Sequence, residues 1–371
     1  MSVPATKTAV LTAVGDLMFY GPMAERMRAA ADPLWGFRPL GRALLEGDLL
    51  FGNFETPISA RAENEPDAPA AYFAPPGVGA ALAEYGFDVV NLAHNHIYDF
   101  GAEGVECTLA ELDEAGLPHV GIGRTTEEAS APAIVRAANG TTLGFLGYTT
   151  ANTALDRRHD YVACFPDEEQ VAADVAELAG KVDFAAVSCH CGSQYNPYPA
   201  PETRRLARAA IEAGASVFLG HHPHVPQGVE RIGKGLGVYS LGDFVAPVHT
   251  EQTRRTFFIR IRLAGAAVED YDVIPCFITD DCQTILAEGK LGEDIAAHIR
   301  ELSSAISAGT SDDLHFETAR KRFFSQYVRS WIEELRFGGP KVLWRKVRNL
   351  RGYHLQLIGR ILVGKLLFWR R

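Results

Sequence analysis

Side chains of the kinds that bind metal ions follow five short apolar runs of this sequence. The runs and the polar residues after them are 8–14 with Asp16, 48–51 with Glu55, 87–92 with His94, Asn95 and His96, 182–188 with His190, and 216–219 with His222 and His224. Carboxylate, amide and imidazole groups together form a ligand set suited to Zn²⁺, Mn²⁺ or Fe. A single Gly-Asp after a strand is more often a turn or a helix cap, so the prediction of a metal site rests on the recurrence.

The segment 91–101, with the sequence Asn-Leu-Ala-His-Asn-His-Ile-Tyr-Asp-Phe-Gly, carries a specific signal. Asn95 can offer its amide oxygen to a metal while the neighbouring His96 faces a substrate. Asp99, three residues further on, can fix the tautomer of His96 by accepting a ring N–H. The alternative interpretation is a helix N-terminus with polar caps.

The segment 220–225, Gly-His-His-Pro-His-Val, is the strongest local signal. His222 and His224 alternate, so both can present nitrogens around a metal pair, and Pro223 between them stiffens the loop. His190 by itself is ambiguous, because a lone histidine at a strand end is usually a hydrogen-bonded core residue. Its position at the end of a similar apolar run favours a place in the same site.

The elements that must position these residues are alternating strands and helices. The apolar runs are short and rich in β-branched residues, and helix-like stretches at 102–115, 168–179 and 202–213 separate them. Such alternation predicts a partly parallel sheet with covered faces and its chemistry at the carboxyl ends of the strands. Later apolar runs at 237–241, 256–263 and 268–274 have little helix between them, which predicts an antiparallel second sheet. The expected fold is therefore a two-sheet α/β sandwich.

Composition places the chain among folded globular proteins, and charge divides it in two. Of 371 residues, 47% are hydrophobic and 22% are charged, which is enough to bury a core. The net charge of −10 conceals a segment, 320–371, with 14 Lys and Arg against two acids, or +12, and a remainder of −22. Six scattered cysteines lack zinc-ribbon or disulfide spacing, which is typical of free thiols in a reducing compartment.

The basic segment suggests an anionic surface as a partner. Helical patterns begin near residue 289, so we expect a body at 1–288 and a helical, basic extension at 289–371. The stretch 355–368 is apolar but too short for a membrane span, and it suits an interfacial basic helix or a helix packed on a protein. No secretion signal precedes the first strand, so we expect a cytoplasmic protein, either free or peripheral at the inner membrane. The acidic body has no basic groove, which argues against nucleic acid.

Six of these segments together resemble the CapA family of bacterial capsule and poly-γ-glutamate synthesis, part of the calcineurin-like metallophosphatase superfamily. The matching segments are GDLMF, GNFETP, AHNHIYDFG, CHCGSQY, GHHPHVPQGVE and YSLGDFV, in order over residues 8–275. The resemblance implies a four-layer α/β/β/α sandwich of the metallophosphatase type, with the helical basic extension outside it.

The resemblance also implies a set of metal-facing positions, which are Asp16, Glu55, Asn95, His190, His222 and His224. The centre is expected to hold one or two divalent ions of Mn, Zn or Fe, and Glu55 can bridge two of them. Asn95, His190 and His222 then complete one site, and Asp16 and His224 half-fill the other. His96 matches the proton-transfer histidine of the family. The superfamily usually has a histidine two residues after the first Asp, where this chain has Met18. One of the two metal sites is therefore expected to be the weaker.

Departures from the family motifs surround the expected pocket and leave three functions open. His94, Cys191, Gln194 and Asp243 replace an Asn, a Trp, a Glu and an Asn of the family. The leading hypothesis is a metal-dependent hydrolase acting on an anionic capsule polymer or peptide, with His96 protonating the leaving group. A peptide epimerase of the lasso-peptide type is the second, with His94, His96 and Asp243 as catalytic candidates. A non-catalytic polymer-binding or export factor is the third.

Overall fold

The computed structural model describes residues 7–59, 72–151, 162–164, 166–247, 250–265 and 267–322. The chain divides into two compact units, 1–309 and 310–371. The described part of the second unit is the helix α9 (Ser311–Arg322). The segment 355–368, which the sequence analysis interpreted as an interfacial basic helix or a helix packed on a protein, lies outside the described residues. Among the described residues, no helix combines the length and apolar character needed to cross a membrane.

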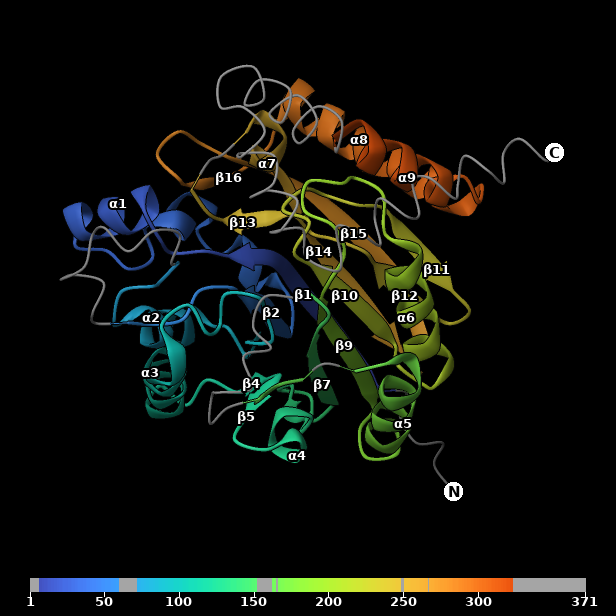
Figure 1. Cartoon of the computed structure of the whole chain (residues 1–371), viewed down its shortest axis with the longest axis horizontal. Coiled ribbons are helices and arrows are strands. Elements are labelled where there is room, and N and C mark those ends of the chain that lie inside the picture. The colour runs from blue at the N-terminus through green and yellow to red at the C-terminus, as the bar shows by residue number, and fades with distance from the viewer. Residues whose placement is uncertain are drawn as a thin grey trace, which may run out of the picture. The chain divides into compact units, whose positions relative to one another are not determined.

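Two sheets form the centre of the first unit (Figure 1). The first sheet runs in the order β16 (Thr284–Leu286), β15 (Ala267–Ile278), β14 (Arg255–Ala264), β1 (Thr8–Leu17), β2 (Leu49–Phe54), β3 (Val89–Asn91) and β4 (His119–Val120), and β13 (Asp243–Val245) also pairs with β1. The second sheet runs in the order β11 (Val229–Ile232), β12 (Gly235–Val238), β10 (Val217–His221), β9 (Phe184–His190), β7 (Thr142–Thr149) and β6 (Ala133–Arg136). A small antiparallel pair, β5 (Ile122–Gly123) and β8 (Val162–Ala163), lies apart from both sheets.

Helices cover the outer face of each sheet. Strand side chains alternate between two faces, so one set contacts these helices and the other set contacts the opposite sheet. The helices α1 (Pro22–Ala30), α2 (Val78–Tyr85) and α3 (Gly101–Glu114) pack with Leu50 and Phe54 of β2. The helices α5 (Glu168–Ala179) and α6 (Pro201–Glu212) pack with β7, β9 and β10 (Figure 1). The intervening residues of the strands, such as Leu49 and Phe51 of β2, pack between the sheets. The predicted four-layer α/β/β/α sandwich is confirmed.

The remaining short elements are α4 (Thr126–Ala129), α7 (Glu251–Arg254) and two 3₁₀ helices, Trp35–Leu40 and Ala43–Glu46. The long helix α8 (Gly289–Ser307) contributes Ile295 and Ile299 to the core between the sheets. The hydroxyl of Ser303 on α8 accepts a hydrogen bond from the amide of Val229 at 2.9 Å. The predicted domain boundary at 288–289 stays a prediction, since most of the predicted extension is outside the described residues.

One expectation about the sheets is wrong. The runs 256–263 and 268–274 form β14 and β15, which are antiparallel as predicted, but they join the first sheet through the pairing of β14 with β1. The run 237–241 contributes to β12 of the second sheet instead. The apolar pattern records that a strand is buried, and it does not record which of two buried sheets the strand enters.

Two glycines permit the close backbone approaches on which the site depends. A Cβ on Gly15 would lie 1.9 Å from the carbonyl oxygen of Gly242, so β1 and the segment before β13 can approach only without a side chain there. A Cβ on Gly220 would similarly lie 2.0 Å from the carbonyl oxygen of Tyr239. These contacts bring Asp16 and the histidines after β10 close to Asp243.

Candidate metal centre

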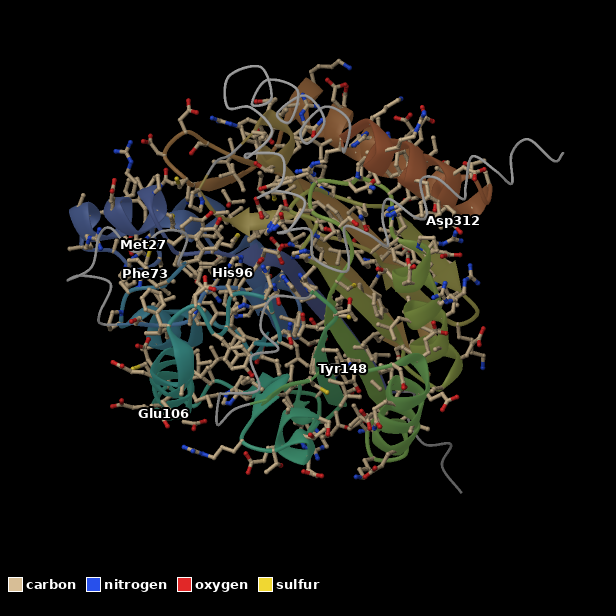
Figure 2. The ribbon with its side chains drawn as sticks, in the orientation of Figure 1. Met27, Phe73, His96, Glu106, Tyr148 and Asp312 are labelled. Carbon is tan, nitrogen blue, oxygen red and sulfur yellow. The ribbon has the colours of Figure 1, made fainter. Side chains whose placement is uncertain are left out.

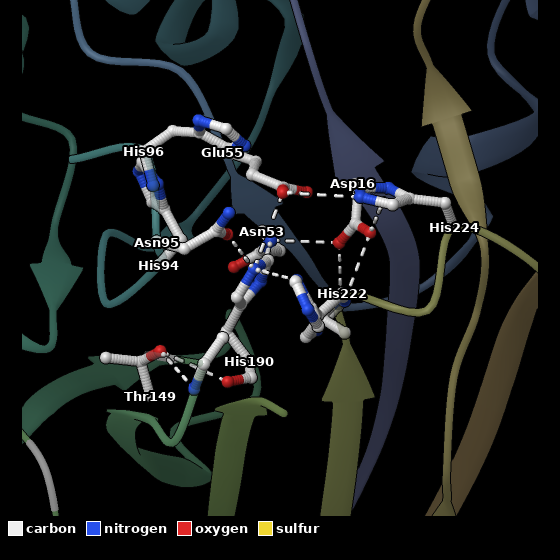
Figure 3. Close-up of polar contacts among 12 residues, drawn as sticks. Asp16, Asn53, Glu55, His94, Asn95, His96, Thr149, His190, His222 and His224 are labelled. Atoms are coloured by element: carbon white, nitrogen blue, oxygen red, sulfur yellow. Dashed lines mark hydrogen bonds and ion pairs between the residues drawn. The ribbon is translucent and has the colours of Figure 1, made fainter. Parts of the chain in front are cut away.

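The carboxyl ends of strands from both sheets converge on one cluster of polar side chains (Figure 3). Asp16 lies on β1 and Glu55 directly follows β2, while Asn95 and His96 follow β3. His190 ends β9, and the loop after β10 carries His222 and His224. β1, β2 and β3 are mutually parallel, as are β9 and β10, so the carboxyl ends of the strands in each group meet at one edge of their sheet. The structure therefore brings together all six residues that the sequence analysis assigned to the metal.

Asp16 is fully buried and held by hydrogen bonds at both carboxylate oxygens. Its Oδ1 accepts from Asn53 Nδ2 at 2.9 Å and lies 3.2 Å from His221 Nδ1. Its Oδ2 accepts the backbone amide of His222 at 3.2 Å. Burial alone would raise the pKa of Asp16, but the hydrogen bond and charge of His221, with the nearby His224, lower it below its ordinary value. Asp16 is therefore a fixed and ionised carboxylate.

Glu55 occupies the middle of the cluster without a hydrogen bond. Its side chain is fully buried, and neither carboxylate oxygen has a hydrogen-bond partner among the described residues. Oε1 lies 3.4 Å from His190 Nε2 on one side and 3.8 Å from His224 Nε2 on the other. Burial, followed by the negative charges of Asp16 and Asp243, raises the pKa of Glu55 well above its ordinary value. A buried carboxylate in this situation requires a proton or a cation.

His190, His222 and Asn95 converge on one side of Glu55 (Figure 3). His190 Nε2 lies 2.7 Å from the Asn95 amide oxygen and 3.0 Å from His222 Nδ1. Burial, followed by neighbouring imidazoles, lowers the pKa of both histidines, that of His222 to about 3. Both rings are therefore neutral at pH 7, which is the form that binds metal ions.

His224 lies on the other side of Glu55, next to Asp16 and Asp243. Its Nδ1 is 2.8 Å from Asp243 Oδ1 and 3.5 Å from Asp16 Oδ2. Burial would lower the pKa of His224, but the charge and hydrogen bond of Asp243 raise it above its ordinary value. The backbone adopts a positive φ at His222 (93°) and at His224 (58°), which costs on the order of 1–3 kcal/mol for each residue. This strained loop turns both imidazoles toward the cluster.

His96 and Asp99 form the predicted pair beside the cluster. His96 Nδ1 lies 2.9 Å from Asp99 Oδ2, and the same oxygen accepts the backbone amide of Tyr72 at 2.9 Å. Nε2 of His96 is buried without a hydrogen-bond partner among the described residues. Figure 3 shows His96 on the Glu55 side of the centre, and Figure 2 labels its position in the view of the whole chain. The geometry thus matches the predicted orientation of His96 by Asp99.

His94 is held by the backbone through one ring nitrogen, while its other ring nitrogen, Nε2, is buried without a hydrogen-bond partner among the described residues, like that of His96. Its side chain is fully buried, and Nδ1 accepts the backbone amide of His96 at 3.2 Å. Burial, followed by the charge of His96, lowers the pKa of His94 well below its ordinary value. This contact stabilises the turn that carries Asn95 and His96. A catalytic role for His94 stays a prediction.

Sequence reasoning did not assign functional roles to several residues of the centre. Asn53 connects the two sides, because its Nδ2 donates to Asp16 Oδ1 and lies 3.2 Å from His190 Nδ1. His221 contacts Asp16, and the rings of Tyr20 and Tyr72 stack with centroids 3.9 Å apart. Asn53 lies within GNFETP and His221 within GHHPHVPQGVE, so their places in these two motifs were the signal that could have identified them as part of the centre. Nothing in the sequence pairs Tyr20 with Tyr72, which are 52 positions apart.

The residues fit a divalent metal ion. Two groups of residues could each hold an ion. In each group the ligand atoms all lie within 4.8 Å of one another, and the groups are Glu55 with His190 and His222, and Asp16 with Glu55 and His224. Glu55 belongs to both groups and is the buried carboxylate that lacks hydrogen bonds. Mixed imidazole and carboxylate ligands suit Zn²⁺, Mn²⁺ or Fe, and the geometry does not select among them. These two groups hold the residues that the sequence analysis assigned to two half-sites, and their occupancy by metal stays a prediction.

Comparisons with known proteins connect this centre to one family. The model of the family described as "Bacterial capsule synthesis protein PGA_cap" matches residues 10–248. The capsule biosynthesis protein CapA of Bacillus anthracis is 30% identical over 280 residues, covering 73% of this chain and 67% of that protein. The PGA biosynthesis protein CapA of Bacillus subtilis (strain 168) is 29% identical over 268 residues, covering 71% of this chain and 70% of that protein.

Among solved structures, a 5'-nucleotidase precursor from Thermus thermophilus aligns with a TM-score of 0.42 and 14% identity, covering 81% of this chain and 59% of that one. A hypothetical protein from the same organism aligns with a TM-score of 0.46 and 18% identity, covering 72% of this chain and 98% of that one.

Proposed function

Because the chain belongs to the bacterial capsule synthesis protein family, we propose that it is a metal-dependent hydrolase that acts in capsule or poly-γ-glutamate biosynthesis. The relatives named for capsule and PGA biosynthesis support the pathway, and the metal centre supports the chemistry. The proposed substrate is an anionic polymer or peptide of that pathway. The matched region, residues 10–248, contains all the residues of the two ligand groups.

The observation that carries the proposal is the environment of Glu55. Its carboxylate is buried without hydrogen bonds among the described residues, and imidazole nitrogens of His190 and His224 lie 3.4 and 3.8 Å from Oε1 on its two sides. Several kcal/mol of desolvation oppose an isolated carboxylate in such a place. A cation held by either group would remove this cost. Glu55 is therefore best explained as a bridging ligand.

Four residues would hold an ion on one side of the centre and three on the other, with Glu55 common to both. Glu55, Asn95, His190 and His222 form the first set. Asp16, Glu55 and His224 form the second. A divalent ion bound there acts as a Lewis acid and lowers the pKa of water toward about 7.

His96 is the proposed proton donor to the leaving group. The Asp99 carboxylate accepts only, so it holds the proton on Nδ1 of His96 and directs Nε2 away from itself. In the doubly protonated form of His96 the second proton is on Nε2, which is buried and unpartnered among the described residues, so this form is placed to give that proton to a bound substrate atom and to keep the one on Nδ1. Tyr72 contributes its backbone amide to Asp99 and its ring to one side of His96, with centroids 4.2 Å apart. These contacts fix the imidazole before a substrate arrives.

The test uses a model phosphodiester and a γ-glutamyl peptide as substrates, with protein loaded with Mn²⁺ or Zn²⁺. His96→Ala should lower the rate by about 10²–10⁴-fold without changing metal content, because general acid catalysis contributes that much. His298→Ala is a matched control, since His298 lies on α8 with its side chain 45% exposed. The control should retain the full rate.

Three results would argue against hydrolysis assisted by His96. Equal rates for wild type and His96→Ala would remove the proposed donor. Deuterium uptake from heavy water into the peptide without cleavage would identify acid/base exchange as in an epimerase. Tight metal binding and polymer affinity, with no turnover of any ester or amide, would identify a binding factor.

A further inference from the structure

The two halves of the metal centre are unequal in their ligands. One half has Glu55, His190 and His222 together with the amide oxygen of Asn95. The other half has Asp16, Glu55 and His224. The position two residues after Asp16, just past the end of β1, offers no further ligand, because Met18 is an apolar residue that packs with Tyr20, Tyr72 and Ala246. The three-residue half therefore depends more strongly on how well its ligands are oriented.

Asp243 lies beside this three-residue half and does not belong to its group of ligand residues. β13 pairs in parallel with β1, and the register places Asp243 opposite Asp16. The side chain is 1% exposed, and Oδ1 lies 2.8 Å from His224 Nδ1. The other carboxylate near this nitrogen, that of Asp16, is further away at 3.5 Å. Asp243 is thus the main partner of the His224 ring on the side away from Glu55.

We propose that Asp243 is a positioning residue, which holds the proton on Nδ1 of His224 so that Nε2 presents its lone pair to an ion shared with Asp16 and Glu55. The inference rests on the proposed metal centre and deepens it. An ionised carboxylate only accepts hydrogen bonds, so His224 must donate from Nδ1. Nε2, which lies 3.8 Å from Glu55 Oε1, is then the nitrogen free to bind the ion.

The charge of Asp243 is consistent with this role. Asp243 repels Glu55, and together with Asp16 it places three buried carboxylates around one half of the centre. Such a concentration of negative charge destabilises the protein without a cation and strengthens the binding of one. The arrangement therefore favours an ion in the three-residue half.

Two substitutions separate the hydrogen bond from the side chain as a whole. Asp243→Ala removes the acceptor, while Asp243→Asn keeps an oxygen that can accept from His224 Nδ1. Asp88→Ala is the control, because Asp88 is a half-buried carboxylate that accepts the Leu50 amide at 2.7 Å at the start of β2. The measurements are Mn²⁺ binding by calorimetry and nitrogen-15 spectra of the histidine rings in the zinc-loaded protein.

Wild type should bind two Mn²⁺ ions per chain, and Asp243→Ala should bind the weaker one about 10–100-fold less tightly, the usual effect of losing such a partner. Asp243→Asn should recover part of this loss, and Asp88→Ala should bind both ions as wild type does. The ring spectra should show His224 protonated at Nδ1 in wild type, assigned by its loss in His224→Gln.

The failures of the two proposals are distinguishable. Unchanged binding by Asp243→Ala, or equal losses in the Ala and Asn variants, would overturn the positioning role. One ion in wild type, lost in His222→Ala but retained in His224→Ala, would overturn it too and leave the proposed metal centre standing. No ion in wild type would overturn both.

Discussion

Replacing Glu55 by Gln removes one negative charge from the centre and changes the size of the side chain very little. The substitution should have opposite effects with and without metal. In metal-free protein it relieves repulsion among buried carboxylates, so the stability should increase. With metal present it removes the ligand common to both groups, so the stabilisation by metal should disappear. A residue that merely supported the fold would lose stability under both conditions.

The size of the stability gain in metal-free Glu55→Gln follows from the distance between Glu55 and Asp16. The ligand atoms of Asp16 and Glu55 lie within 4.8 Å of one another, which corresponds to a repulsion of about 3.5 kcal/mol at an effective dielectric constant of 20. Glu55 avoids part of this repulsion by keeping its proton, because burial, Asp16 and Asp243 raise its pKa. The gain in the metal-free variant should therefore lie between zero and the full repulsion, which is at least about 3.5 kcal/mol because 4.8 Å is the upper limit of the separation.

The gain should grow with pH. Unfolded Glu55 ionises near its ordinary pKa, whereas the folded protein keeps the proton to a higher pH. Over that interval the folded state binds more protons, so the stability of the metal-free wild type falls as pH rises, and the Glu55→Gln variant escapes this loss.

Thermal unfolding in chelator and in metal measures both effects. At about 100 times its dissociation constant, an ion stabilises wild type by about 2.7 kcal/mol, or roughly 3.5 °C for a chain of 371 residues, and the Glu55→Gln variant should lack this shift. Glu230→Gln is the control, because Glu230 is a largely buried carboxylate paired with Arg208 and the Tyr239 hydroxyl, away from the centre. It should lose stability equally under both conditions. A Glu55→Gln variant that is less stable in chelator and keeps the metal shift would refute the reasoning.

Three further predictions concern the separate parts of the centre. His222→Ala and His224→Ala should each lower metal content by one equivalent, as elemental analysis would show, and a loss of both ions from either variant would contradict two half-sites. In metal-free protein the free energy of unfolding should fall by about 1.4 kcal/mol per pH unit for each of His190 and His222 as pH falls below 6.5, because the unfolded chain takes up these protons first. A free energy of unfolding that does not change with pH in chemical denaturation would exclude this. Gly15→Ala should destabilise the fold by more than about 3 kcal/mol, since its Cβ would overlap the carbonyl oxygen of Gly242, and a denaturation midpoint unchanged from wild type would show that the strands can separate there.

The strands and the residues at their ends could be predicted from the sequence because both depend on local pattern. Apolar runs of four to seven residues that stop at polar side chains placed Asp16, Glu55 and His190 at strand ends, and the structure has them there. Helix composition located α5 at Glu168–Ala179, in agreement with the structure. Burial of one face or both faces leaves a periodic record in the chain, so these features need no knowledge of the partner element.

The contacts between distant segments could not be predicted in the same way. His224 contacts Asp243 because β13 pairs with β1, and that pairing depends on close backbone approach at Gly15 rather than on any local pattern. The assignment of β14 to the first sheet has the same origin, since either buried sheet accepts an apolar strand.

The sequence by itself determined which chemical groups are available, namely carboxylates, an amide and imidazoles at strand ends, together with the family to which their motifs belong. Only the tertiary structure decided how those groups are arranged: Glu55 lies between two sets without hydrogen bonds among the described residues, Asn53 connects Asp16 with His190, and Asp243 lies against His224. The physical reason is that ligand type is a property of single residues. The burial of a group, its distances to other groups and its pKa depend on its neighbours in space. The fold can bring those neighbours from far along the chain, as it brings His221 to Asp16 across 205 positions.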